Sequence, residues 1–396
     1  MNVALAVAAA SLSLGAAIAL GLARFSYALL LPAMKADLGW TFAQAGALNT
    51  ANAAGYLAGA LVMPLLSRRF HASQLFMGGA LLATLGIVAT GFTTRFEALL
   101  AIRMACGVFS AIIFVAGGVL ATRLAAAHPR RAGLVLGAYY GGTGWGIILS
   151  ALVVPFSVRA VAHGWQAAWL ALGLVSLGCS LLAWPSVARV SSGVAARPEH
   201  VAGEDPRAPG LGRASRLLVA YGLFGIGYIG YMTFVIALLR GAGMGSAVVT
   251  TFFVALGLAT AASGGVWARV LTRAQGGGAF ACCCVLLSVA VLLPALSTSR
   301  GAIFASGILF GGTFLAVVTS TTAFVRHNLP PARWPAGISA FTIVFAAGQI
   351  AGPVVMGRVA DGTGLSRGFL YSSEVLLLAS VIALGQRSLA PPLGAG

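Results

Sequence analysis

The first apolar segment of the chain contains a charged residue, Arg24, that lies far from the next charge along the sequence. Lys35 follows eleven positions later, which places Arg24 about 16 Å deeper along a helix that rises 1.5 Å per residue. A charge at the centre of a bilayer costs about 2.5–3.5 kcal/mol on insertion scales. Two interpretations stay open: Arg24 faces a wet cavity and binds an anion there, or it has a structural partner or snorkels to the membrane surface.

Tyrosine and amide side chains at helical spacing in other apolar segments extend this set. Tyr27 follows Arg24 by three positions, which places both on one face of an α-helix, and Tyr228 and Tyr231 repeat this spacing. Phenol and amide groups beside a cation are suited to orienting a small organic anion. The alternative for each is an interhelical hydrogen bond within one half of the protein. The candidate substrate-binding residues are Arg24, Tyr27, Asn49, Asn52, Tyr56, Tyr139, Tyr140, Tyr228, Tyr231, Thr342 and Gln349.

The composition indicates a polytopic membrane protein. Of the 396 residues, 59% are hydrophobic and 8% are charged, whereas an ordinary soluble domain has about 25% charged residues. The net charge of +17 does not indicate nucleic-acid binding, because the basic residues lie in short loops rather than in one soluble domain. The histidines are scattered singly and no phosphate-binding loop is present. We therefore expect no metal site, no cofactor and no enzymatic activity.

The apolar segments are long enough for twelve membrane-spanning helices. They fall at residues 3–31, 42–66, 74–94, 97–122, 132–156, 164–187, 216–239, 246–268, 277–298, 301–325, 335–357 and 368–386. Twelve spans place both termini on one side, and the loops of that side hold 15 basic residues against 7 on the other. The positive-inside rule then predicts that both termini lie in the cytoplasm. The first segment has no basic start, so we expect it to be retained rather than cleaved as a signal peptide.

The chain divides into two similar halves, residues 1–187 and 216–396, joined by a proline-, glycine- and arginine-rich cytoplasmic linker at 188–215. The halves repeat at an offset of 204, which pairs Gly21 with Gly225 and holds as far as the eleventh span. Two parallel six-helix halves with a site between them near the bilayer midplane are typical of secondary transporters. We therefore expect an all-α polytopic membrane protein with twelve transmembrane helices in two pseudo-symmetric six-helix halves.

Local motifs make the chain similar to the major facilitator superfamily (MFS) of transporters. Arg103 begins an RxxxG motif like that of the superfamily's fourth span, and Arg68 and Arg69 lie where the superfamily has a basic cytoplasmic loop. The stretches Gly21–Tyr27 and Gly164–Trp169 resemble more specifically the bacterial YbfB/YjiJ-type subgroup. The resemblance implies an alternating-access transporter in the bacterial inner membrane. It also implies a monomer, with a small-molecule substrate and the lipid bilayer as partners.

The resemblance implies gating or coupling roles for Arg68, Arg69 and Arg103, and the repeat adds Arg273 as the counterpart of Arg69. The alternative for Arg103 is hydrogen bonding to backbone carbonyls within its own half. Apart from Glu97 at the mouth of the fourth span, Glu374 is the only acidic residue inside a predicted span, so it is the candidate site for a coupled proton. Coupling through the substrate's own carboxylate, or no coupling at all, stays open.

Two features of the superfamily are missing. Met63 and Pro64 stand where an acidic residue usually ends the second span, and the fifth span lacks the Gly-Pro pair of the antiporters. These departures weaken the interpretation as a drug–proton antiporter. We therefore predict secondary active transport of a small organic solute and favour an organic anion. The alternative is efflux of amphipathic drugs or other toxic compounds.

Glycines at four-residue spacing form stripes on three predicted helices. Such stripes let membrane helices approach closely, and the resemblance places the second, fifth and eleventh spans at the interface between the halves. We therefore expect these glycines to form contacts that slide during transport, with static packing as the alternative. The stripes are Gly55/Gly59, Gly133/Gly137/Gly141 and Gly348/Gly352.

Overall fold

The computed structural model describes residues 3–158, 161–193, 211–330 and 333–389, and within these ranges it contains helices and no strands. The helices of the first half are α1 (Val3–Ala16), η1 (Ala17–Phe25), α2 (Tyr27–Leu38), α3 (Phe42–Leu66), α4 (Ala72–Thr90), α5 (Phe96–Ala126), η2 (Pro129–Arg131), α6 (Ala132–Ser157) and α7 (Trp165–Gly193). Those that follow are η3 (Leu211–Ala214), α8 (Ser215–Gly241), α9 (Ser246–Arg273), α10 (Gly278–Leu296), α11 (Arg300–Asn328), α12 (Trp334–Thr363) and α13 (Leu365–Leu384). Most of the linker predicted at 188–215 lies outside the described residues.

The first transmembrane segment is a composite of α1, η1 and α2. It runs over Val3–Leu38, which is 36 residues, so the predicted span 3–31 is too short at its end. Counting this composite as one, the described part of the chain has 11 helices long and apolar enough to cross a membrane. The remaining long helix, α3, has 25 residues. Its hydropathy is lowered by polar residues such as Asn49 and Asn52, so its membrane location follows from its neighbours rather than from its own composition.

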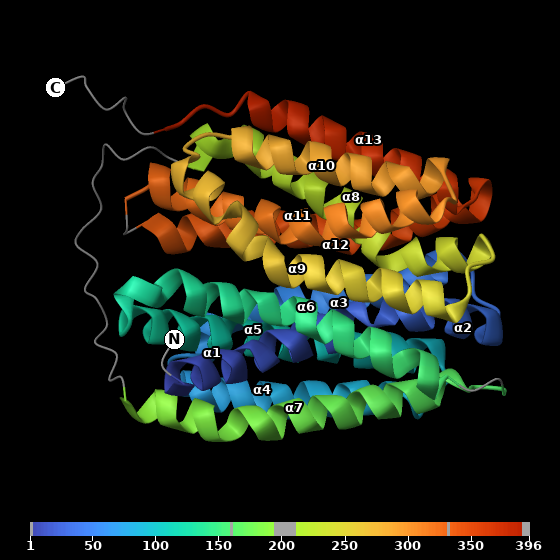
Figure 1. Cartoon of the computed structure of the whole chain (residues 1–396), viewed down its shortest axis with the longest axis horizontal. Coiled ribbons are helices and arrows are strands. Elements are labelled where there is room, and N and C mark those ends of the chain that lie inside the picture. Colours follow the sequence, from blue (N-terminus) through green and yellow to red (C-terminus); the bar gives the residue numbers. More distant parts are fainter. Residues whose placement is uncertain (1–2, 159–160, 194–210, 331–332, 390–396) are drawn as a thin grey trace.

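The helices form two bundles that lie one above the other in Figure 1. Helices α1 to α7 pack mainly on one another, and helices α8 to α13 do the same. Three helix pairs join the bundles through extensive contacts, namely α3 with α12, α6 with α9, and α2 with α8. This architecture confirms the all-α polytopic fold that the sequence predicts.

The internal repeat is visible in how the helices of each bundle pack. Gly107 of α5 lies against the backbone of Asn52 in α3, and Gly311 of α11 lies against the backbone of Leu256 in α9. Both residues of the second pair lie 204 positions after the corresponding residues of the first. The offset found in the sequence therefore corresponds to the same close helix approach in both bundles.

We expect Gly107→Ala to destabilise the protein, because the added methyl group would overlap the carbonyl oxygen of Asn52. Overpacking of this kind costs roughly 1–3 kcal/mol. Gly118→Ala on the same helix is the matched control, because there the methyl group would only reach ordinary contact with the Tyr139 ring, at 3.9 Å. Thermal unfolding of the purified variants should show a lower midpoint for Gly107→Ala and an equal or higher midpoint for Gly118→Ala. Equal midpoints for both would contradict this account.

Two of the three glycine stripes pack inside their own half. Gly55 and Gly59 lie against α5, and Gly348 and Gly352 lie against α8. The prediction that these residues line the interface between the halves is therefore wrong. Four-residue spacing fixes which residues share a helix face, but it does not fix which neighbour that face meets. In the third stripe, Gly141 does meet α9 of the other half.

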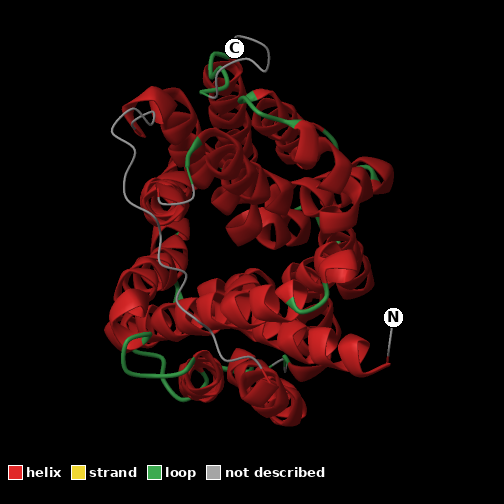
Figure 2. Cartoon of the chain, turned by 90° about the vertical axis from the view of Figure 1, so that its left-hand side faces the viewer, coloured by secondary structure: helices red, strands yellow, loops and turns green. Residues whose placement is uncertain are grey.

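The two bundles touch closely at one end and separate toward the other. We call the end with the start of α1 and the end of α13 the terminal end, and the other the opposite end; Figure 2 looks onto the terminal end. Along α6, Gly141 and Gly144 lie against Ala261 and Gly257 of α9. Nearer the terminal end, a side chain at Gly133 would have no neighbouring atom within 4 Å. The α6–α9 contact is thus close toward the opposite end, and the two helices diverge toward the terminal end (Figure 1).

Candidate functional site

Arg24 lies at the centre of the protein with its charge unpaired. Its side chain is 3% exposed, and its Nε and Nη2 atoms have no hydrogen-bond partner among the described residues. The guanidinium carbon lies 5.8 Å from the centroid of the Tyr56 ring and 6.0 Å from that of Phe25. Tyr228, from the other half, is also within electrostatic range of the guanidinium. Arg24 therefore lies between the bundles with free hydrogen-bond donors.

The helix that carries Arg24 is a π-helix, η1. Its last turn is closed by a five-residue hydrogen bond from the Ser26 N–H to the Gly21 carbonyl, 2.9 Å long. Gly21 packs against the backbone of Gly146 in α6, where a larger side chain would not fit. Because π-turns rotate the following residues relative to an α-helix, the i, i+3 spacing does not place Arg24 and Tyr27 on one face. The prediction that Arg24 and Tyr27 share one helix face is therefore wrong.

Tyr27 faces a second buried arginine, Arg103 of α5. The Tyr27 hydroxyl donates to the Ala45 carbonyl at 2.7 Å, and the Arg103 guanidinium carbon lies 5.6 Å from the Tyr27 ring centroid. On its other side the guanidinium lies 5.1 Å from the Trp169 ring. None of its three nitrogens has a hydrogen-bond partner among the described residues. Arg103 is thus enclosed within the first half, held by two aromatic rings rather than by backbone carbonyls.

The predicted stripe on α3 is divided between two directions. The Asn49 amide donates to the Thr233 hydroxyl of α8 at 2.6 Å and so joins the halves. The Asn52 amide donates instead to the Arg103 carbonyl at 3.1 Å within the first half. Tyr56, half-buried, faces Arg24. Only the first and last residues of the stripe therefore lie between the bundles.

Other predicted site residues are placed as follows. The Gln349 amide donates to the Tyr228 hydroxyl, so these two form one group at the centre. The Tyr139 hydroxyl donates to the Phe114 carbonyl at 2.5 Å, and the Tyr231 hydroxyl bonds with Ser306 at 2.7 Å. All three bonds lie within a single half, which is the alternative that the sequence left open.

A small pocket lies nearer the terminal end of the second half. It has a volume of about 50 Å³, and its lining includes Tyr221, Thr321 and Thr342. The Thr342 hydroxyl donates to the Ile338 carbonyl at 2.8 Å. Thr342 is therefore separate from the group around Arg24. Tyr140, the remaining candidate, lies on α6 in the first half and is 37% exposed.

The residues predicted for gating and coupling lie away from Arg24, apart from Arg103. Arg68, Arg69 and Arg273 are exposed at the terminal end. Glu374 is exposed on α13, next along the same face to the exposed residues Tyr371 and Leu378, so it points outward from the bundle. Proton coupling through Glu374 stays a prediction without support from its position.

The sequence analysis missed Asp361, which joins the halves at the opposite end. Its Oδ1 atom accepts a hydrogen bond from the Phe42 N–H at 2.7 Å, and its Oδ2 atom accepts one from the Ala43 N–H at 2.9 Å. The carboxylate of α12 thus caps the first turn of α3, where backbone N–H groups are free and negative charge is favoured. The predicted eleventh span ended at residue 357, which assigned Asp361 to a loop. The partner lies 318 positions away, so spacing could not reveal it.

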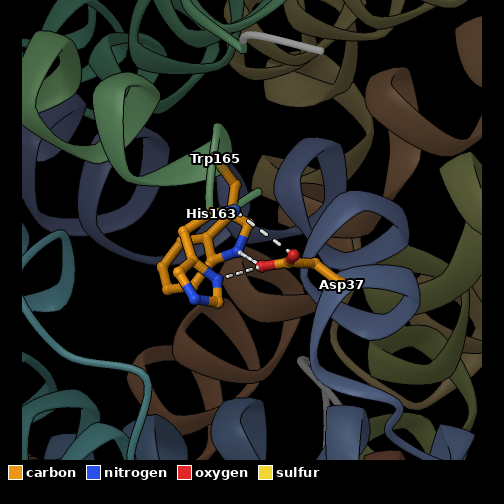
Figure 3. Close-up of polar contacts among 3 residues, drawn as sticks. All are labelled: Asp37, His163 and Trp165. Carbon is orange, nitrogen blue, oxygen red and sulfur yellow. Dashed lines mark hydrogen bonds and ion pairs between the residues drawn. The ribbon is translucent and has the colours of Figure 1, made fainter. Parts of the chain in front are cut away.

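Asp37 forms a second carboxylate cluster at the opposite end, within the first half (Figure 3). Its Oδ2 atom lies 2.6 Å from His163 Nδ1 and accepts a hydrogen bond from Trp165 Nε1 at 2.6 Å. Its Oδ1 atom accepts from the backbone N–H of His163 at 3.2 Å. His163 has a φ of +55°, a left-handed conformation that non-glycine residues seldom adopt. The cluster fastens the end of α2 to the start of α7.

Two six-helix bundles around a buried polar centre define a secondary transporter of the MFS fold. Among solved structures, a bacterial homologue of the human lysosomal transporter Spinster, inward-facing and unoccupied, has a TM-score of 0.70 and 13% identity over 98% of this chain and 100% of that chain. The human organic anion transporter MFSD10 (TETRAN) gives 0.63 and 18% over 96% and 99%, and the nucleoside transporter NupG gives 0.69 and 15% over 97% and 98%. At these identities the likeness shows the fold alone.

The sequence comparison narrows this class to one family. The family model described as "Uncharacterised MFS-type transporter YbfB" matches residues 16–384, and the chain belongs to this family of transporters. The resemblance of Gly21–Tyr27 and Gly164–Trp169 to the YbfB/YjiJ-type subgroup is thereby confirmed. No functionally curated protein matches the chain in sequence.

Proposed function

We infer that the protein carries a small organic anion across the bacterial inner membrane by alternating access, with both termini in the cytoplasm. The observation that carries this inference is the unpaired guanidinium of Arg24 between the two bundles. Among the described residues no carboxylate pairs with Arg24: Asp37 bonds with His163 and Trp165, and Asp361 bonds with α3. A buried charge without a partner is costly, and a substrate carboxylate would remove that cost.

The separation of the bundles at the terminal end supports an inward-facing state for this structure. With the termini in the cytoplasm, the terminal end faces the cytoplasm and the closed end faces the periplasm. Asp361 and the Asn49–Thr233 hydrogen bond then hold the periplasmic side shut. In the reverse state these contacts would break, and the two bundles would meet at the terminal end instead.

The alternative, efflux of amphipathic drugs, fits the aromatic side chains around the site. Many such compounds are cations, however, and both Arg24 and Arg103 place positive charge in the first half without a carboxylate partner among the described residues. One structure of this fold is a human organic anion transporter, but the likeness at 18% identity adds only the fold. The two buried arginines, rather than the similarity to this transporter, therefore favour an organic anion as the substrate. A coupled proton and a monomeric state are part of the proposal.

A thermal-stability screen of the purified protein tests this function. A ligand present at 100 times its dissociation constant stabilises the folded protein by about 2.7 kcal/mol. We expect small organic carboxylates to raise the unfolding midpoint and their amide counterparts, which match them in size but lack the charge, to leave it unchanged. Stabilisation by lipophilic cations and not by carboxylates would replace the anion proposal with drug efflux.

A further inference from the structure

The second half presents a set of aromatic rings, of which the sequence indicated only Tyr228 and Tyr231 as candidate site residues. Seven rings from α8, α11 and α12 lie nearly parallel, with angles between stacked neighbours of 6° to 22° and centroid separations of 4.1 to 6.5 Å. We call this set the aromatic stack. Its members are Tyr221, Phe224, Tyr228, Phe310, Phe314, Phe345 and the fully buried Tyr231. The rings from three helices share one orientation, whereas aliphatic side chains have no ring plane to align.

One ring of the stack remains accessible. Tyr221, Phe224, Tyr228, Phe310 and Phe314 are buried, with at most 3% of their surface exposed. Phe345 of α12 is only partly buried. It stacks on Tyr221 at 4.7 Å and 10° and on Tyr228 at 5.6 Å and 19°. Phe345 is therefore the member of the stack that can offer free ring surface to a ligand.

The first half presents aromatic rings beside Arg24. Tyr56 lies 6.5 Å from Phe114, and Phe114 lies 5.8 Å from Tyr140. None of these three rings, which we call the Tyr56 cluster, is fully buried. The guanidinium carbon of Arg24 lies 5.8 Å from the Tyr56 ring centroid, and Arg24 is within electrostatic range of Tyr228 in the stack. Arg24 is thus close both to the Tyr56 cluster and to the aromatic stack.

A direct contact between the halves lies beside Arg24. The Phe25 ring, adjacent to Arg24 in the chain, meets the Phe314 ring edge to face at 5.9 Å and 86°. The cation, the Tyr56 cluster and the stack therefore converge from both halves on one region. A ligand with a carboxylate on Arg24 would extend its remaining atoms along these rings.

We propose that the substrate is an aromatic carboxylate, with its carboxylate bound to Arg24 and its planar ring lying between Phe345 and Tyr56. This rests on the proposed transport of organic anions and specifies the part of the anion that is not charged. Rings in proteins favour offset-stacked or edge-to-face contacts, and such contacts strengthen binding about two- to tenfold per pair beyond the buried area. A saturated ring of the same size cannot lie flat against two rings and would lose this gain.

The test compares acids that match in size and charge and differ in planarity. Binding of benzoate and phenylacetate to the purified full chain is measured by calorimetry against cyclohexanecarboxylate and cyclohexylacetate. We expect the aromatic member of each pair to bind about tenfold more tightly. Equal affinities within both pairs would overturn the aromatic inference and leave the anion proposal standing. No binding by any of the four acids would overturn the aromatic inference, and the carboxylate screen described above would then decide the anion proposal separately.

Variants of Phe345 test whether this ring is responsible for the preference for aromatic over saturated acids. We expect Phe345→Leu to reduce the aromatic-to-saturated ratio to about twofold or less, without weakening the binding of cyclohexanecarboxylate. Phe345→Tyr, which keeps the ring, should retain the ratio, and so should Phe92→Leu at an exposed position on the surface. An unchanged ratio in Phe345→Leu would contradict the placement of the ring.

Discussion

Replacing Arg24 by glutamine should weaken binding of the carboxylate substrate about a hundredfold or more. Removing one partner of a buried, hydrogen-bonded charge pair costs roughly 2–5 kcal/mol, and each 1.4 kcal/mol corresponds to a factor of ten. Glutamine keeps hydrogen-bond donors in place but removes the charge. The measurement is the affinity of the purified variant for the best carboxylate from the stability screen, together with its transport into proteoliposomes.

The same substitution should raise the stability of the unliganded protein. Arg24 leaves Nε and Nη2 without a hydrogen-bond partner, and a neutral side chain removes the cost of burying that charge. Loss of binding combined with a higher unfolding midpoint distinguishes a functional charge from a structural one. If Arg24→Gln transports the substrate as well as the unchanged protein does, Arg24 is not the anion site.

Arg103→Gln is the matched control for this experiment. Arg103 is also buried and without hydrogen-bond partners, but it lies enclosed between the Tyr27 and Trp169 rings inside the first half. We expect its substitution to change the affinity less than tenfold. Equal losses for both variants would mean that the summed positive charge of the first half, rather than contact with Arg24, attracts the anion.

Asp361→Asn should shift the protein toward the state that is open at the opposite end. The substitution removes the charge and one of the two acceptor oxygens from the hydrogen bonds that join α12 to the first turn of α3, at 2.7 and 2.9 Å. Because the carboxylate is exposed, we discount the usual strength of such bonds and expect the equilibrium between the two states to move by about tenfold.

Accessibility of a single cysteine measures this shift. Thr233 is 1% exposed and bonds with Asn49 across the interface, so a cysteine at this position is protected while the opposite end is closed. In a background without the native cysteines, Thr233→Cys should react several-fold faster with a membrane-impermeant maleimide when Asp361→Asn is added. Asp37→Asn, at the same end but with all its described bonds in the first half, should leave the rate unchanged. Equal rates for the Asp361→Asn variant and its parent would contradict the role of Asp361.

The sequence predicted the helices, their division into two bundles and the buried arginine, because apolar segment length and a lone charge are local properties. It could not predict which neighbour each helix face meets. Tyr139 and Tyr231 were chosen with the same reasoning as Tyr56, yet their hydroxyls bond within one half. The contact of Asp361 with Phe42 depends on two helices meeting after the chain has folded, and no spacing encodes that meeting.

The aromatic stack illustrates a different limit. Phe345 and Phe314 could not be selected as site residues from the sequence, because phenylalanine is an ordinary residue of membrane helices. Only the nearly parallel orientation of rings from α8, α11 and α12 distinguishes them from packing residues. The sequence therefore indicated only polar residues as site candidates. The residues that would bind a non-polar group of the substrate could not be predicted from it.

The π-helical turn at Ala17–Phe25 has a consequence for how the first span tolerates length changes. A π-type hydrogen bond closes over five residues instead of four, so the segment accommodates what amounts to an inserted residue. Deleting one residue there would restore a continuous α-helix and leave the faces of α1 and α2 in register, whereas a deletion inside α1 or α2 would rotate the parts on its two sides by about 100°. The segment around Arg24 can thus absorb a one-residue deletion within the helix itself, at the expense of the arginine's orientation.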